Sequence, residues 1–288
     1  MPASPLFEEL DYRKTPLGEL ILRRRTVLSL DNREVHEIIL GDAYLMSSLF
    51  TEVEKALSHL GLAAVEDSFP GVATLDVVVG GLGLGYTARA ALEHDSVASL
   101  LVVDYLEPVI EWHEKGLVPL GPGLVADQRC RFVHGDFFEL ALAPGSGPGF
   151  DPESPGRLFH AVLLDIDHSP ANLLHERHGQ FYSAEGLRVL AAKLHPGGVF
   201  ALWSDDAPEA GFMAALGEVF ATCESHIVTF PNPLQDRESS STVYVARTAK
   251  TWDGPLATQF PERPRPLSGW SGRSRNRANS SLRRLPRR

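Results

Sequence analysis

The chain of 288 residues has few cysteines and no long apolar run, so it is poor in the groups that build disulfide frameworks and membrane spans. Its two cysteines, Cys130 and Cys223, lie far apart, each at the start of an expected strand. This predicts reduced thiols and no metal site. No apolar run approaches the roughly 20 residues of a membrane-spanning helix, and the N-terminus lacks the apolar core of a secretory signal. We therefore expect a cytoplasmic protein without a membrane partner.

Basic residues are also few, 27 against 37 acidic ones, for a net charge of −10. Nine of the arginines follow Glu262, where no acid occurs, so the rest of the chain is more acidic than the total suggests. An acidic surface binds nucleic-acid phosphates poorly and suits a small or cationic substrate. We expect a small-molecule acceptor, and nucleic-acid contact only through the Arg-rich C-terminal tail. The Pro, Arg, Ser and Gly content of residues 250–288 predicts disorder.

Strand, glycine turn, helix, strand and acid follow one another from Leu75 to Asp104. The apolar run 75–79 is typical of a buried strand, and the helix expected over 86–93 offers free N–H groups at its start. A second strand, over 98–103, ends in Asp104, which can accept hydrogen bonds from both hydroxyls of a ribose. Glycines let the backbone of the turn pass close to a ligand; they are Gly80, Gly81, Gly83 and Gly85. No second glycine turn follows, which favours a single nucleoside over NAD.

The rest of the chain alternates strands and helices. This predicts an α/β fold, Rossmann-like, with a mostly parallel seven-stranded sheet. The final two strands are joined by a loop without a helix, so we expect the last strand to be antiparallel. Further strands are expected over 130–133, 159–164, 199–203, 226–230 and 242–246, helices over 107–116, 183–194 and 209–221, and loops over 119–127 and 143–156.

A small β-rich piece precedes the nucleoside-binding domain. Residues 12–46 predict a hairpin or meander, with strands over 18–24 and 34–40, and residues 47–62 predict a helix. We divide the chain into an N-terminal piece over 1–66, a Rossmann-like transferase domain over 67–249 and a tail over 250–288.

Polar or glycine residues occupy five successive strand tips, where ligands bind in such sheets. Gly135 and Asp136 are placed to meet an adenine. Asp165, Asp167 and His168 are expected at the reactive end of the ligand, where an acid or a histidine could orient or deprotonate a nucleophile.

Four other residues that could bind ligands have simpler interpretations. His175 and His178 are spaced like a metal pair but lack companion ligands, so we interpret them as residues of a surface helix. Tyr182 and Trp203 are interpreted as packing residues.

These motifs resemble the class I S-adenosylmethionine-dependent transferase fold and, within it, the spermidine synthase family. Residues 77–85, VVVGGLGLG, stand where that family has a strand and GGGDGG. Gly135-Asp136-Phe137 resembles its adenine motif G-D-G or G-D-A, and Phe181-Tyr182 its F-Y. Residues 164–167 begin where it has D-S-[ST]-D-P, whose first Asp is catalytic. The likeness covers roughly residues 18–247.

The resemblance implies roles for these positions. Asp165 is implied as catalytic, and the N-terminal β piece as a homodimer contact. The nucleoside contacts implied by the glycine turn and the strand tips are Gly80, Gly81, Gly83, Gly85, Asp104, Tyr105, Gly135, Asp136 and Phe137.

Three positions depart from the family. Gly83 replaces the acid that holds the amino group of the aminopropyl donor. Phe50-Thr51-Glu52 stands where the family has Tyr-His/Gln-Glu, so the acceptor-binding Tyr is absent. The second Asp of D-S-[ST]-D-P is replaced by His168 or shifted to Asp167.

Three functions remain open. The first is methyl transfer from S-adenosylmethionine to a small nucleophile, with Asp165 or His168 as base. The second is aminopropyl transfer from decarboxylated S-adenosylmethionine to an amine, with Asp165 as base and the cation held by Glu52, Asp167, Asp205 and Asp206. The third is a non-catalytic nucleoside-binding or interaction protein. Gly83 favours the first over the second, because a donor that keeps its carboxylate needs no acid there. None of the three requires a metal.

Overall fold

The structure of the protein is a computed structural model that describes residues 6–144, 147 and 149–250. Its N-terminal part is an antiparallel sheet in the order β1-β2-β3-β4. The sheet confirms the β-rich N-terminal piece and begins earlier than expected, because β1 pairs with β2 along its length. The strands are β1 (Phe7–Thr15), β2 (Gly18–Val27), β3 (Arg33–Leu40) and β4 (Ala43–Ser47), with a short 3-10 turn, η1 (Leu28–Leu30), after β2.

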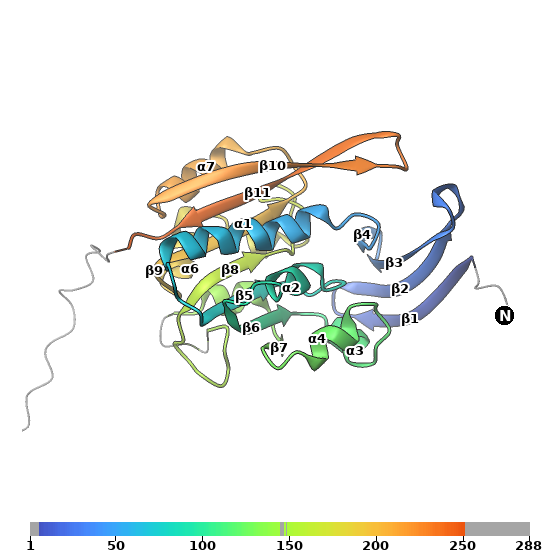
Figure 1. The fold of residues 1–288 in the computed structure, drawn as a ribbon, viewed down its shortest axis with the longest axis horizontal. Helices are drawn as coiled ribbons and strands as arrows, with labels where there is room; N and C mark the ends of the chain where they lie inside the picture. Colours follow the sequence, from blue (N-terminus) through green and yellow to red (C-terminus); the bar gives the residue numbers. More distant parts are fainter. Residues whose placement is uncertain (1–5, 145–146, 148, 251–288) are drawn as a thin grey trace, which may run out of the picture. The chain divides into compact units, whose positions relative to one another are not determined.

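The second sheet has seven strands in the order β10-β11-β9-β8-β5-β6-β7 (Figure 1). β5, β6, β7, β8 and β9 are parallel, whereas β11 is antiparallel to both of its neighbours. This confirms the predicted Rossmann-like fold. The strands are β5 (Leu75–Gly80), β6 (Val97–Asp104), β7 (Cys130–His134), β8 (Phe159–Leu164), β9 (Leu194–Ser204), β10 (Thr222–Asn232) and β11 (Arg237–Arg247).

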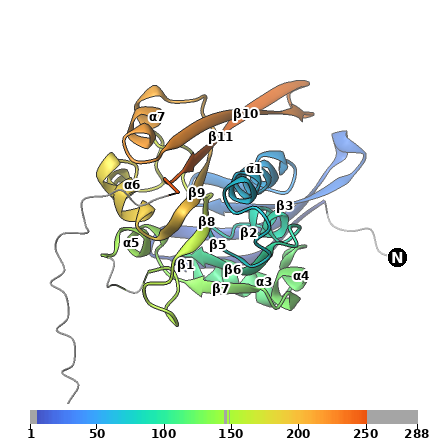
Figure 2. The ribbon, with the colours of Figure 1, turned by 60° about the vertical axis from the view of Figure 1, so that its left-hand side comes forward.

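The helices cover both faces of this sheet. They are α1 (Glu52–Ser68), α2 (Tyr86–Ala91), α3 (Glu107–Glu114), α4 (Gly121–Ala126), α5 (Phe137–Leu142), α6 (Ala184–Ala191) and α7 (Ala210–Gly217), with the 3-10 turn η2 (Glu176–Gln180). Buried side chains of α1 to α4 form one core, and those of α5 to α7 form the other. Figure 2 shows the two groups of helices on opposite sides of the central strands.

Two of the expected boundaries were wrong. α1 begins at Glu52 rather than Ser47, because Ser47 still pairs with Glu37 in the N-terminal sheet. The loop expected over 119–127 contains α4. Pro122 lies in the first turn of α4, where a missing N–H is tolerated, and buried Leu124 anchors the turn.

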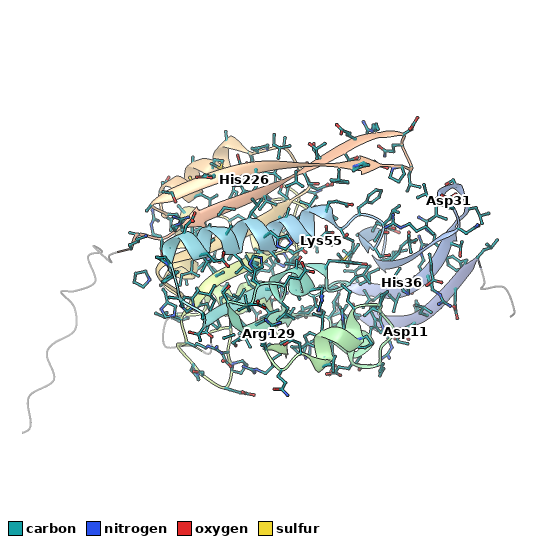
Figure 3. The ribbon with its side chains drawn as sticks, viewed as in Figure 1. Asp11, Asp31, His36, Lys55, Arg129 and His226 are labelled. Carbon is teal, nitrogen blue, oxygen red and sulfur yellow. The ribbon has the colours of Figure 1, made fainter. Side chains whose placement is uncertain are left out.

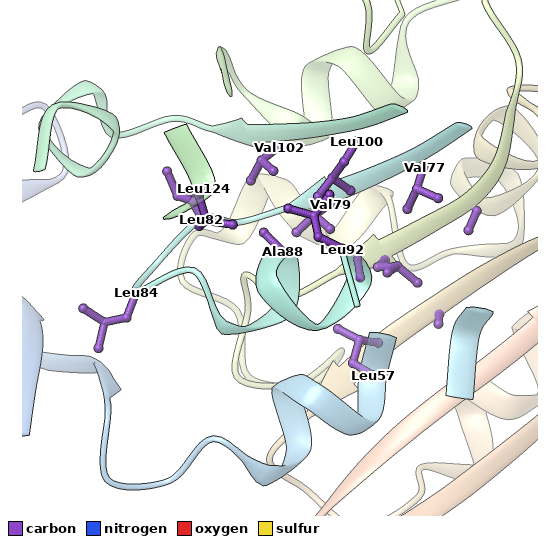
Figure 4. Packing of buried hydrophobic residues seen from close by; sticks show 14 of the residues in the cluster. Leu57, Val77, Val79, Leu82, Leu84, Ala88, Leu92, Leu100, Val102 and Leu124 are labelled. Carbon is purple, nitrogen blue, oxygen red and sulfur yellow. The ribbon is translucent and has the colours of Figure 1, made fainter. Parts of the chain in front are cut away.

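Alternating side chains along the central strands build the two cores. Val77 and Val79 of β5 point into the first core, and Val78 points into the second. This is the period-two pattern of a strand that is buried on both faces. Figure 4 shows Leu57 of α1 and Ala88 of α2 turned towards the strands that carry Val79 and Leu100.

The N-terminal sheet packs at the carboxyl edge of the parallel strands, towards which the arrowheads of β5 and β6 point in Figure 1. Leu20, Leu22 and Ile38 belong to the same buried cluster as β5 and β6. Trp112 Nε1 of α3 donates to Oδ2 of Asp11 on β1 over 2.7 Å; Asp11 is labelled in Figure 3. The carboxyl edge of the sheet is therefore roofed by the N-terminal strands.

Residues 251–288, most of the expected tail, lie outside the described residues. Within the part of the chain that is described, no helix has the length and apolar content needed to cross a membrane.

Candidate active site

A cavity of about 380 Å³ lies between the N-terminal sheet and the strand tips. One wall comes from the N-terminal sheet and α1; it includes Pro16, Leu17, Ile38, Leu40, Leu45, Met46 and Glu54. The opposite wall comes from the strand tips and includes Gly81, Gly83, Asp104, Tyr105, Asp136, Phe137, Asp165 and His168. A volume of a few hundred Å³ suits a small-molecule ligand such as a nucleoside.

The glycine turn after β5 is held against the end of β8. Gly81, Gly83 and Gly85 have φ angles of +94°, +48° and +91°, a region that glycine adopts without strain. A Cβ on Gly81 would lie 2.1 Å from the carbonyl oxygen of Asp165. Only a glycine therefore lets the turn approach β8 this closely and leave the cavity open.

Asp104, at the end of β6, links the turn to the next helix. Its Oδ2 accepts from the Leu82 N–H at 2.9 Å, and its Oδ1 accepts from the Leu106 N–H at 2.8 Å. Burial raises the pKa of Asp104, while both backbone N–H groups oppose that rise. The carboxylate is thus fixed at the cavity wall, where it fits the two hydroxyls of a ribose.

Asp136 caps the helix that follows β7. Its Oδ1 accepts from Phe138 N–H at 2.9 Å and Glu139 N–H at 3.2 Å, and its Oδ2 forms an ion pair with Arg177 at 2.6 Å. The Arg177 guanidinium also lies over the Tyr105 ring, 5.8 Å from its centre. Asp136 and Tyr105 therefore both line the cavity next to an arginine that the sequence did not single out.

Asp165 occupies the tip of β8 and faces the same cavity. Thr87 Oγ1 of α2 donates to Asp165 Oδ2 at 2.6 Å. Burial raises the pKa of Asp165 to well above that of an exposed aspartate, and the Thr87 hydrogen bond moderates the rise. A half-buried carboxylate with a raised pKa is suited to accept a proton from a substrate.

Glu54 is the acid that sequence reasoning missed. It lies in the first turn of α1 and lines both the first cavity and a second, adjoining cavity of about 610 Å³. Burial raises the pKa of Glu54, and the negative charge of Asp165 raises it further. The sequence shows two acids, Glu52 and Glu54, two residues apart. It does not show which of them faces the first cavity, because that depends on how the start of α1 packs.

The second cavity joins the first at its acidic end. Glu54, His168 and Trp203 line both. Glu52 and Asp205 line the second cavity, together with the hairpin of β10 and β11. Trp203 Nε1 is buried and has no hydrogen-bond partner among the described residues. The expected role of Trp203 as a packing residue is thus incomplete, because its ring forms part of the wall between the cavities.

The remaining expected site residues lie around these cavities. Asp167 is fully buried behind the first cavity, and Asp206 is exposed beside neither cavity. Gly80 and Gly135 form backbone hydrogen bonds with Asp165 and Asp104, and Gly85 starts α2. His178 is buried, so the expected surface helix is wrong at that position. In the described part of the chain, no three His, Cys, Asp or Glu side chains are grouped as a metal site.

Sequence comparison finds relatives that are named as aminopropyltransferases. The chain is 27% identical over 238 residues to polyamine aminopropyltransferase 2 of Pseudomonas aeruginosa, covering 75% of this chain and 62% of the relative. It is 26% identical over 195 residues to polyamine aminopropyltransferase of Pyrobaculum islandicum, covering 66% and 62%. The chain therefore spans less than two thirds of the length of these relatives. No family model matches it.

Structure comparison gives the same likeness. A spermidine synthase solved in complex with the transition-state analogue AdoDATO superposes with a TM-score of 0.62 at 16% identity, over 84% of this chain and 74% of that one. The fold is spermidine synthase-like. This confirms the resemblance drawn from the glycine turn and the strand-tip acids, and it fits the small N-terminal sheet beside the Rossmann-like sheet.

Proposed function

We propose that this spermidine synthase-like protein is an aminopropyltransferase that uses decarboxylated S-adenosylmethionine and a small-molecule amine. This reverses the order in which the sequence ranked the two transfer reactions. The relatives carry aminopropyltransferase names, and a structural neighbour binds AdoDATO. Methyl transfer gains no support over this reaction from them.

The observation that carries the proposal is the pair of carboxyl groups, Glu54 and Asp165, where the two cavities meet. The pKa values of both are raised by burial, and the charge of Asp165 acts on Glu54. Two such acids destabilise each other unless a cation lies between them. An ammonium group relieves this repulsion, and both the amine acceptor and the donor's amino group can provide one.

Glu54 also answers the objection raised by Gly83. In the resembling family an acid of the glycine turn holds the amino group of the donor, and here that acid is absent. Gly83 and Glu54 line the same cavity, and Met46 packs over Gly83, where a Cβ would lie 2.8 Å from its sulfur. We infer that Glu54, from the opposite wall, supplies the carboxylate that the turn lacks.

The residues divide the work in the following way. Asp104 holds the ribose, Asp165 accepts a proton from the attacking amine, and the acids of the second cavity hold the rest of a cationic acceptor. When bound, the donor supplies a sulfonium-activated propyl carbon, so that a C–N bond forms as a C–S bond breaks. Positioning and deprotonation of the amine are the contributions of the chain. A homodimer and a cytoplasmic location remain predictions.

The test is to incubate the full chain with decarboxylated S-adenosylmethionine and a panel of diamines and polyamines, and to measure release of 5′-methylthioadenosine. We expect amine-dependent release that falls about 10²- to 10⁴-fold in Asp165→Asn. Asp206→Asn, outside both cavities, is the matched control and should retain activity. Methyl transfer from S-adenosylmethionine with no release from the decarboxylated donor would overturn the proposal.

A further inference from the structure

A buried histidine that the proposed reaction does not use is held by a buried acid. His178 Nδ1 lies 2.9 Å from Oδ1 and 3.0 Å from Oδ2 of Asp167. Asp167 also accepts from the Tyr182 hydroxyl at 2.9 Å and from the Leu174 N–H at 2.7 Å. An ionised carboxylate can only accept hydrogen bonds, so the ring nitrogen that faces Asp167 must donate. The single ring hydrogen of neutral His178 therefore lies on Nδ1.

The ring of His178 is fixed in a second way. It stacks on Phe138, with ring centres 3.8 Å apart and planes inclined by 20°. Phe138 is the second residue of α5, whose cap is Asp136. The Asp167 hydrogen bond and the Phe138 ring together fix the tautomer and the orientation of the imidazole, as a carboxylate does for a metal-bound histidine.

The other ring nitrogen is available to a ligand. His178 lines the first cavity, and 9% of its side chain is exposed. Nε2 forms no hydrogen bond within the described part of the chain, yet it is not among the buried atoms that lack a partner. It is therefore reached from the cavity. With the hydrogen on Nδ1, Nε2 can only accept a hydrogen bond.

The position of Nε2 suggests which ligand atom it meets. His178 follows Arg177, which pairs with Asp136 at the tip of β7, next to the β6 tip that carries Asp104. Tyr105, Asp136 and His178 line the same cavity as Asp104, so a base that extends from a ribose on Asp104 towards β7 lies against them. There the Asp136 oxygens already have partners: Oδ1 accepts from backbone N–H groups at the start of α5, and Oδ2 pairs with Arg177. His178 Nε2 is a side-chain acceptor in this wall that has no partner among the described residues.

We propose that Nε2 of His178 accepts a hydrogen bond from the 6-amino group of the adenine, with Asp167 as the positioning residue that fixes the tautomer. The inference rests on the proposed function, since it assumes a nucleoside in the first cavity. It departs from the family motif, in which the acid at the position of Asp136 was expected to read the base. Asp167 then acts through His178 and does not bind a substrate cation.

This arrangement distinguishes a 6-amino purine from a 6-oxo purine. The 6-oxo oxygen would face Nε2 acceptor against acceptor, and both groups would lose their water without gaining a partner. Such mismatches at buried polar groups cost a large part of the affinity. We expect the adenine nucleoside to bind about tenfold or more tightly than its 6-oxo counterpart.

The test is calorimetric binding of 5′-methylthioadenosine and 5′-methylthioinosine to the full chain. In wild type, 5′-methylthioadenosine should bind about tenfold or more tightly than 5′-methylthioinosine. In His178→Phe, which keeps the ring stacked on Phe138, the preference should fall to about threefold or less. Asp167→Asn can donate its amide N–H to Nδ1 and move the ring hydrogen to Nε2, so the preference should narrow or reverse. His175→Phe changes an exposed histidine of the same wall and should keep the preference.

The outcomes separate this inference from the proposed function. If wild type binds neither nucleoside, both fail. If it binds the two equally, or if a folded His178→Phe variant keeps the wild-type preference, only the role of His178 is overturned. Should the variants unfold, the 6-dimethylamino analogue decides with wild type alone: it has no 6-amino hydrogen, so affinity equal to that of 5′-methylthioadenosine would overturn the inference.

Discussion

Thr87 donates a hydrogen bond of 2.6 Å to the Asp165 carboxylate, from a helix that begins at the glycine turn. The bond stabilises the ionised acid and opposes the rise in the Asp165 pKa that burial causes. Thr87→Val removes it, so the pKa should rise further and less of the base should be ionised at a given pH. We expect the acidic limb of the kcat/KM profile for amine-dependent release of 5′-methylthioadenosine to move to higher pH.

The serine variant is the control for this prediction. Thr87→Ser keeps the hydroxyl and should leave the limb near its wild-type position. Thr87 is buried, so loss of a methyl group alone changes packing without changing the donor. An acidic limb that stays in place in Thr87→Val would mean that Asp165 is not the group that titrates in the free enzyme.

Glu54 should destabilise the empty protein at high pH. Its pKa in the folded state lies above the ordinary 4.5, mainly because of burial and also because of the negative charge of Asp165. The folded state therefore binds more protons than the unfolded state above this pH, and the free energy of unfolding falls as the pH rises. Glu54→Gln removes the effect. We expect the variant to exceed wild type in stability at pH 9 and to match it near pH 4, by denaturant unfolding.

The same substitution should weaken binding of both substrates, because Glu54 lines both cavities. Without one carboxylate of the pair, the KM for decarboxylated S-adenosylmethionine and the KM for the amine should each rise about tenfold or more. Glu66→Gln is the matched control, because Glu66 is exposed on the same helix and lines neither cavity. It should leave the stability at pH 9 and the KM values near those of wild type. Equal effects of the two variants would contradict the role assigned to Glu54.

Gly81→Ala should destabilise the protein and close the nucleoside cavity. The added Cβ would lie 2.1 Å from the Asp165 carbonyl oxygen, at a φ of +94°. Gly71→Ala is a close control, since Gly71 has a φ of +80° with nothing within 4 Å of the added atom. Gly71→Ala should cost about 1 to 2 kcal/mol for the backbone conformation alone. Gly81→Ala should cost about 1 to 3 kcal/mol more and abolish nucleoside binding; equal losses would show that the contact relaxes freely.

Much of the nucleoside wall could be predicted from the sequence because its determinants are local. The apolar run of β5, the glycines after it and Asp104 at the end of β6 lie within one stretch, and the buried strands order them in space. Asp165 follows β8 in the same way. Strand tips of a parallel sheet meet at one edge, so their residues come together whatever the rest of the chain does.

The acceptor side of the site could not be predicted, because it depends on helix phase and on irregular segments. Glu52 and Glu54 lie two residues apart on α1, and only the packing of the helix shows that Glu54 reaches both cavities whereas Glu52 reaches the second. His178 and Asp167 are joined across a segment without regular structure before η2. Their pairing depends on burial among Phe138 and Tyr182, which no periodicity in the sequence records.

A second buried histidine, His113, forms a hydrogen bond with the glycine turn. His113 of α3 is fully buried, and its Nε2 lies 2.9 Å from the Gly83 carbonyl oxygen, to which it donates. Burial lowers its pKa from 6.5 to about 4, against the opposing effect of the Gly83 hydrogen bond. The ring is therefore neutral in the folded protein at pH values where an exposed histidine is protonated.

This neutrality predicts a loss of stability in acid. Between pH 6.5 and about 4 the unfolded state takes up a proton at His113 that the folded state does not, so the free energy of unfolding falls as the pH drops. The full effect is about 3 kcal/mol, as an order of magnitude. His113→Gln can still donate to Gly83 but does not titrate, and its stability should fall less over this range. Because burial also lowers the pKa values of His36 and His160, the measured quantity is the difference between wild type and variant in denaturant unfolding at several pH values. Parallel pH profiles would show that His113 does not contribute, whereas convergence of the two profiles towards pH 4 would show that the turn rests on a neutral ring.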